Sequence, residues 1–172
     1  MNNKQQNTST QAFSLLELMA VVTIIGILAS VAIPVMGKYL KKSKTGEASM
    51  NLRKIYDGEV AYYQEEITLA NGTVAQKQFV QVAQTPSGLP GRDKRVGDWS
   101  TWEALKFSSD SPVLYVYETE ITGVGVDSAF TARAQGDVDG DTSTSLFERV
   151  GSVDARGEIT GGAAVFTLDE LE

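Results

Sequence analysis

The chain divides into a long apolar run near its N-terminus and a body in which apolar and polar residues are interspersed. From Phe13 to Met36 the sequence reads FSLLELMAVVTIIGILASVAIPVM and contains one charged residue, Glu17. A helix of this length spans roughly 30 Å or more, which is enough to cross a bilayer. A cleaved secretory signal has a shorter apolar stretch, of roughly 7 to 15 residues, followed by a small-residue cleavage site. The pattern therefore predicts a membrane-spanning helix over residues 13–36.

After Pro34 the apolar spacing remains helical. Positions that recur at intervals of four and three residues are Ala48, Leu52, Ile55, Glu59 and Tyr62, and they are flanked by Tyr56, Val60 and Tyr63. This spacing predicts an amphipathic stripe that lies on a sheet. We expect the helix to continue to about Glu66 and to end at Ala70-Asn71-Gly72.

The C-terminal part of the chain predicts strands. Runs with strand character lie at Val113–Glu118, at the alternating Phe130, Ala132 and Ala134, at Leu146–Val150 and at Val165–Leu168. Short strands separated by turn residues indicate an antiparallel meander. A long helix on such a sheet is an α+β fold.

The expected organisation has three parts: residues 1–12, residues 13–36, and a head over residues 37–172. Within the head we expect the helix to reach about residue 66, a loop over 67–106, and the sheet over 107–172. The loop contains Thr85-Pro86-Ser87-Gly88-Leu89-Pro90-Gly91, which is a strong turn signal. Trp99 and Trp102 are expected to be core residues and not a ligand site.

Composition limits the chemistry that the chain can perform. Its 172 residues include neither histidine nor cysteine, and its net charge is −7. Without histidine it lacks the commonest general base and metal ligand, and without cysteine it lacks disulfides and thiol nucleophiles. We therefore expect no enzyme and no catalytic residue. The acidic balance provides no basic surface for nucleic acid, whereas oxygen ligands suit hard cations such as calcium.

Glu17 is the unusual residue of the apolar run. A carboxylate at the centre of a membrane helix costs on the order of 2.5–3.5 kcal/mol on insertion scales. Near the end of the helix the cost is smaller, because the side chain reaches the interface. Two interpretations follow: a tolerated interfacial acid, or an acid that awaits a partner cation.

The N-terminal third of the chain resembles the type IV pilins and pseudopilins. A polar leader, then Ala12-Phe13-Ser14-Leu15-Leu16-Glu17, then an apolar run ending at Pro34 is similar to the prepilin motif of that family. The resemblance implies that a prepilin peptidase removes residues 1–12 by cutting between Ala12 and Phe13, and that Phe13 is N-methylated. It implies that Glu17 pairs with the N-terminal amine of a neighbouring subunit. It also implies the pilin fold, in agreement with the α+β arrangement.

By the same resemblance, the chain is expected to be a single-pass inner-membrane protein with its N-terminus inside, and then part of an extracellular pilus. Its partners would be copies of itself, the peptidase and methylase, and the inner-membrane assembly machinery. Gly26 and Pro34 have two interpretations. They are ordinary residues of a membrane helix, where glycine and proline are common, or, by the same resemblance, they bound a segment that loses helicity in the filament, since glycine weakens a helix and proline kinks it.

Three features depart from the family pattern. Ala12 stands where the residue before the cut is usually glycine, although both are small. The leader is poor in basic residues, and four lysines instead follow the span, which is the reverse of the positive-inside rule for this orientation; they are Lys38, Lys41, Lys42 and Lys44. The paired cysteines of many pilins are missing.

An acidic segment near the C-terminus is a candidate metal site. Asp137, Asp139 and Asp141 lie two residues apart, and Glu148 follows, so that the four acids match the first, third, fifth and twelfth positions of an EF-hand. Thr142 replaces the required glycine, however, and strands flank the segment. It is therefore not an EF-hand. The open interpretations are an unrelated calcium site and a solvated turn rich in Asp and Gly.

Three functions remain open from the sequence. The first is a structural pilin that polymerises through its apolar helix, as in pili that serve adhesion or twitching motility. The second is a pseudopilin of a type II secretion system. The third is a membrane-anchored calcium-binding domain that does not polymerise.

Overall fold

The computed structural model describes residues 13–66, 72–88, 90–162 and 164–171. The chain divides into two compact units, Met1–Lys38 and Tyr39–Glu172. Helix α1 (Leu15–Gln64) contributes its first part to the first unit and its second part to the other, and Pro34 lies inside it. The first part of α1 is long and apolar enough to cross a membrane.

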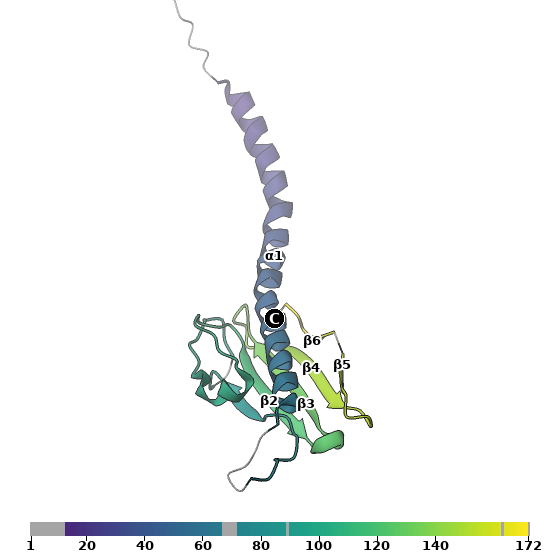
Figure 1. Cartoon of the computed structure of the whole chain (residues 1–172). Coiled ribbons are helices and arrows are strands. Elements are labelled where there is room, and N and C mark those ends of the chain that lie inside the picture. The colour runs from purple at the N-terminus through teal and green to yellow at the C-terminus, as the bar shows by residue number, and fades with distance from the viewer. Residues whose placement is uncertain (1–12, 67–71, 89, 163, 172) are drawn as a thin grey trace, which may run out of the picture. The chain divides into compact units, whose positions relative to one another are not determined.

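In the second unit, α1 packs against an antiparallel sheet (Figure 1). The strands are β1 (Val82–Thr85), β2 (Val116–Thr122), β3 (Ala129–Gly136), β4 (Ser145–Val153), β5 (Ile159–Gly161) and β6 (Phe166–Leu168). Two short 3-10 helices are η1 (Trp99–Leu105) and η2 (Gly125–Asp127). The strand order is β1-β2-β3-β4-β5, and β6 also pairs with β4. The predicted α+β fold, a long helix on an antiparallel sheet, is therefore confirmed.

The strands follow the two-residue alternation of a half-buried sheet. In β3 the side chains of Phe130, Ala132 and Ala134 are buried. In β4, Phe147 is buried opposite Ala134, with which it is in register. Alternate residues of these strands therefore face the core that the sheet forms with α1.

The core of the second unit is formed by one face of α1, the inner face of the sheet and aromatic residues from the connections. Its largest fully buried side chains are Trp102, Tyr115, Tyr117, Phe79, Phe130 and Phe147. On α1 the buried residues include Ala48, Leu52, Ile55, Glu59 and Tyr63. The predicted stripe is therefore correct for four of its five members, with Tyr63 buried and Tyr62 half-buried.

The structure differs from the sequence expectation in the connections. The segment 67–106, expected to be a loop, contains β1 and η1. Only the two end residues of β1 are buried, so it lacks the alternation that marks a strand; pairing with β2 places it. The three-residue β5 is likewise placed by β4. Helix α1 ends at Gln64, two residues before the expected end, and Ala70 and Asn71 lie outside the described residues.

Candidate functional site

The first turn of α1 positions Glu17. Ser14 precedes the helix, and its Oγ accepts a hydrogen bond from the Glu17 backbone N–H at 3.2 Å. Ser14 and Glu17 thus have the spacing of a capping box, with Ser14 as the N-cap. This capping box was not predicted from the sequence, although S-x-x-E is its signal. A carboxylate in the first turn is also favoured by the positive end of the helix dipole, so that Glu17 has a local role in addition to any intermolecular one.

The described part of the first unit exposes apolar side chains on all sides. Large exposed side chains of this part include Phe13, Leu15, Leu16, Leu18, Met19, Val21, Val22, Ile24, Ile25, Ile27, Leu28, Val31, Ile33, Val35 and Met36. A helix that is apolar all round requires lipid or other protein around it. Gly26 lies within this helix and has open space around it. Both Gly26 and Pro34 are helical in this structure, and the predicted loss of helicity in a filament stays a prediction.

The acidic loop lies between β3 and β4, and the structure brings three of its four predicted ligands together. One carboxylate oxygen from each of Asp137, Asp139 and Asp141 lies within 4.8 Å of the others. Asp137 is buried, and its two oxygens accept hydrogen bonds from the backbone N–H groups of Gly140 (2.6 Å) and Thr142 (3.1 Å). These bonds hold the loop in a tight turn, so the cluster also has a purely structural explanation.

The fourth predicted ligand, Glu148, belongs to a different cluster. It lies on β4 in register with Arg133 of β3, and its Oε1 accepts a hydrogen bond from Arg133 Nε at 2.6 Å. The same guanidinium contacts Glu120 at 2.6 Å and Glu118 at 3.5 Å. The hydrogen bonds that Arg133 donates to Glu148 and Glu120 raise the pKa of Arg133 further above its usual range. Strand register thus directs Glu148 to an ion-pair network on the sheet.

Two lysines of α1 reach the acidic loop. Lys41 Nζ lies 2.5 Å from Asp139 Oδ2, and Lys44 Nζ donates a longer hydrogen bond of 3.4 Å to the carbonyl of Val138. The hydrogen bond from Lys41 lowers the pKa of Asp139. In this structure the Lys41 ammonium therefore places a positive charge at Asp139. A calcium ion bound by the cluster has to compete with it.

Glu59 is a buried acid in the core of the second unit. Its side chain is fully buried, Oε2 accepts a hydrogen bond from the Val80 backbone N–H at 2.9 Å, and Oε1 has no hydrogen-bond partner among the described residues. Burial raises its pKa from 4.5 to about 7, although the hydrogen bonds from Val80 and Thr119 oppose that shift. The sequence gives one indication of this buried acid, because Glu59 occupies a position of the predicted amphipathic stripe.

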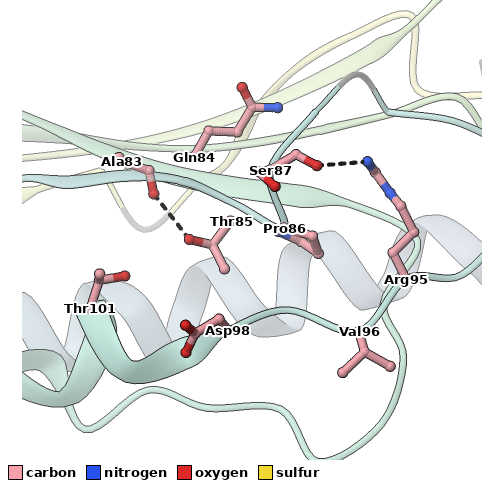
Figure 2. A pocket seen from close by; sticks show the side chains of 9 residues that line it. All are labelled: Ala83, Gln84, Thr85, Pro86, Ser87, Arg95, Val96, Asp98 and Thr101. Atoms are coloured by element: carbon pink, nitrogen blue, oxygen red, sulfur yellow. Dashed lines mark hydrogen bonds between the residues drawn. The ribbon is translucent and has the colours of Figure 1, made fainter.

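A surface cavity of about 620 Å³ lies beside Pro86 (Figure 2). Its polar side chains largely bond to the protein itself: Arg95 Nη1 donates to the Ser87 carbonyl at 3.2 Å, and Asp98 accepts from the Ser100 N–H. The latter bond lowers the pKa of Asp98. Figure 2 shows Arg95 and Asp98 apart and not facing one another. We derive no catalytic role from this cavity.

Comparison with known proteins bears on the N-terminal segment. Residues 7–33 match the family described as the prokaryotic N-terminal methylation motif. Over 60 residues the chain is 43% identical to the type IV major pilin protein PilA of Myxococcus xanthus (strain DK1622), a match that covers 35% of this chain and 27% of that pilin. No solved structure matches the chain.

These matches agree with the structure in the region where they apply. The methylation motif covers the residues that precede and form the exposed apolar part of α1. The chain spans only about a quarter of the length of the pilin it matches. The N-terminal methylation motif at residues 7–33, the long apolar helix and the 60-residue stretch shared with a major pilin make this chain similar to the type IV pilins.

Proposed function

We propose that this chain is a structural subunit of a type IV pilus and that it polymerises through the apolar part of α1. The observation that carries the proposal is the run of exposed apolar side chains from Phe13 to Met36, most of which lies within the methylation motif. In the inner membrane, lipid covers this surface. Once the subunit leaves the membrane, only other copies of the same apolar helix offer an equivalent environment, so burial of apolar area drives assembly.

Glu17 makes that assembly selective. Cleavage between Ala12 and Phe13 creates a new amine at Phe13, and N-methylation preserves its charge. A buried carboxylate without a partner is costly, and a buried ammonium from a neighbouring subunit relieves that cost. Correct docking is therefore favoured over other alignments of two apolar helices. The other partners proposed are the prepilin peptidase and methylase and the inner-membrane assembly machinery.

The decisive experiment measures processing and filament formation together. Mass spectrometry of the mature protein is expected to find an N-methylated Phe13 at the N-terminus. Electron microscopy of cells is expected to show pili that disappear when the gene is deleted. An intact Met1, or a cut elsewhere, would contradict the proposal and favour the membrane-anchored domain that does not polymerise.

A type II secretion pseudopilin is the close alternative, because it would share the motif and the apolar helix. Long surface pili support the pilin, whereas a short periplasmic fibre supports the pseudopilin. Calcium binding stays a separate prediction. The proximity of Asp137, Asp139 and Asp141 supports it, and the Lys41 ammonium at Asp139 competes with it.

A further inference from the structure

The solvent side of the second part of α1 carries its charges in two separate groups. Exposed basic residues come first along the helix, and exposed acidic residues come after them, up to and just past the helix end. The basic group is Lys42, Arg53 and Lys54, and the acidic group is Asp57, Glu65 and Glu66. Among the described residues, none of these six side chains takes part in an ion pair.

The two other acids of this part of α1 do not weaken the separation, because both are turned into the protein. Glu47 accepts the Leu114 backbone N–H at 2.8 Å, and Glu59 is fully buried. From Ile55 to Glu66 the chain contains no lysine or arginine. The charges of the basic and acidic groups therefore face solvent without local partners.

Exposed apolar side chains accompany the charges. Tyr39 is 70% exposed, Leu40 52% and Met50 56%. Large exposed apolar side chains on a protein surface are a feature of sites that bind another protein.

A groove runs along the same side of α1. It has a volume of about 310 Å³ and lies between α1 and the end of η1. Small residues line it, namely Gly58, Ala61 and Ala104, and charges border it, namely Lys54, Asp57, Glu65 and Lys106. Small side chains allow the close approach of a partner helix. Lys106 offsets part of the acidic group but leaves it net negative.

We propose that this side of α1 is a subunit interface, and that its occupant is the same side of α1 in a second copy of the chain. The two helices are parallel, with an axial offset of roughly 15–20 Å that places the basic group of one copy beside the acidic group of the next. The inference rests on the proposed function, since it names the head-region contact by which the filament grows.

The parallel arrangement is favoured over an antiparallel pair of helices, because only the parallel one can extend into a filament. An antiparallel pair would also match basic with acidic groups, but it would satisfy both groups of both copies and close as a dimer. The parallel offset leaves one group free at each end, so that the contact repeats without closing.

Charge reversal tests the proposal without knowledge of the precise offset. One full-length variant carries Arg53→Glu and Lys54→Glu, and the other carries Glu65→Lys and Glu66→Lys. Each alone brings like charges together, and we expect a loss of pili of about tenfold or more for each. When the two are co-expressed, alternating subunits again match opposite charges, and pili are expected to return.

Arg156→Glu is the matched control, because Arg156 is exposed on the turn between β4 and β5 and belongs to neither of the two charge groups of α1. It is expected to leave the number of pili unchanged. Circular dichroism of each purified full-length variant checks that it is folded. The proposal is overturned if both folded double variants make normal pili alone, or if co-expression restores none. The proposed function fails separately, if the unaltered chain makes no filament at all.

Crosslinking distinguishes the parallel from the antiparallel contact. The chain has no cysteine, so introduced thiols have no background. Met50→Cys and Ala61→Cys, combined in one chain, leave every charge in place on the exposed helix side. Treatment of pili with a bismaleimide crosslinker is expected to give a ladder of covalent multimers. A product that stops at the dimer, or no product, overturns the parallel interface.

Discussion

The Lys41 ammonium lies 2.5 Å from Oδ2 of Asp139, and this ion pair joins α1 to the loop between β3 and β4. This ion pair gives a structural role to one of the lysines that follow the apolar run. By the positive-inside rule, these lysines argue against a membrane orientation with the N-terminus inside. In the folded head, Lys41 and Lys44 are contacts to the acidic loop. The positions of Lys41 and Lys44 in the sequence are therefore explained by packing in the head.

Calcium is expected to raise the melting temperature of the head, residues 39–172, because an ion that binds only the folded state stabilises it by mass action. Asp139→Asn is expected to reduce that shift. Lys41→Gln is expected to enlarge it, because the competing ammonium is gone. Thermal unfolding in calcium and in chelator provides the measurement. Identical melting in both conditions would leave the solvated turn as the explanation of the three aspartates.

The ion pair itself is expected to contribute little. Both side chains are partly exposed, 32% for Lys41 and 26% for Asp139. Ion pairs of this kind contribute little to stability, because water and salt screen the attraction between the charges. In chelator, Lys41→Gln is therefore expected to leave the free energy of unfolding almost unchanged.

Glu59 is expected to make the stability of the head depend on pH. Its pKa is about 7 in the folded protein, above the ordinary 4.5, so the folded state binds the proton more tightly than the unfolded state. The resulting stability is fully present below pH 4.5 and is lost as the pH rises to about 7. The total loss is on the order of 3 kcal/mol.

Urea unfolding of the head at a series of pH values between 4.5 and 8 measures this effect. Glu59→Gln is the matched control, because the amide has a similar shape and does not titrate. The difference in unfolding free energy between the two proteins is expected to change in favour of Glu59→Gln as the pH rises. A difference independent of pH would show that Glu59 does not titrate in this range.

Glu17 is expected to be required for assembly and not for membrane insertion. Glu17→Gln and Glu17→Ala remove the charge that pairs with the Phe13 amine, so both are expected to reduce pili strongly while the processed protein stays in the membrane. Counting of pili by microscopy and fractionation of membranes test the two parts. Normal pili in both variants would contradict the proposed role of Glu17.

Gly58 is expected to tolerate no side chain. A Cβ at this position would lie 2.4 Å from the carbonyl oxygen of Leu105, which is backbone. Gly58→Ala is therefore expected to destabilise the head by about 1–3 kcal/mol, as overpacking does. Gly46→Ala on the same helix is the control, because a Cβ there meets nothing within 4 Å. It is expected to stabilise the head by about 0.5–1 kcal/mol. Denaturant unfolding of both variants checks the opposite signs.

Local patterns predicted the elements that carry a strong periodic signal. The apolar run and the stripe from Ala48 to Glu59 gave α1, because a helix places every third and fourth residue on one face. The alternation Phe130, Ala132 and Ala134 gave β3 for the corresponding reason in strands. Strands β1 and β5 could not be predicted in this way, since each is three or four residues long and is defined by the strand it pairs with.

The acidic loop shows the limit of spacing as a guide. Asp137, Asp139 and Asp141 lie within one tight turn, so local geometry brings them together. Glu148 lies on the following strand, where register with Arg133 decides its partner. The partner of Asp139 is Lys41, which is 98 residues away in the chain. A rule based on the spacing of nearby residues cannot predict such a contact.

The sequence by itself determined that an apolar helix follows a prepilin motif, and that it carries Glu17 in its first turn. Those are properties of consecutive residues, which need no knowledge of the rest of the fold. Only the tertiary structure decided which carboxylates are paired, buried or free, because pairing and burial depend on groups distant in sequence. In the sequence, Glu59, Glu148 and Asp139 are simply three acidic residues. Packing buries Glu59 in the core, pairs Glu148 with Arg133 and pairs Asp139 with Lys41.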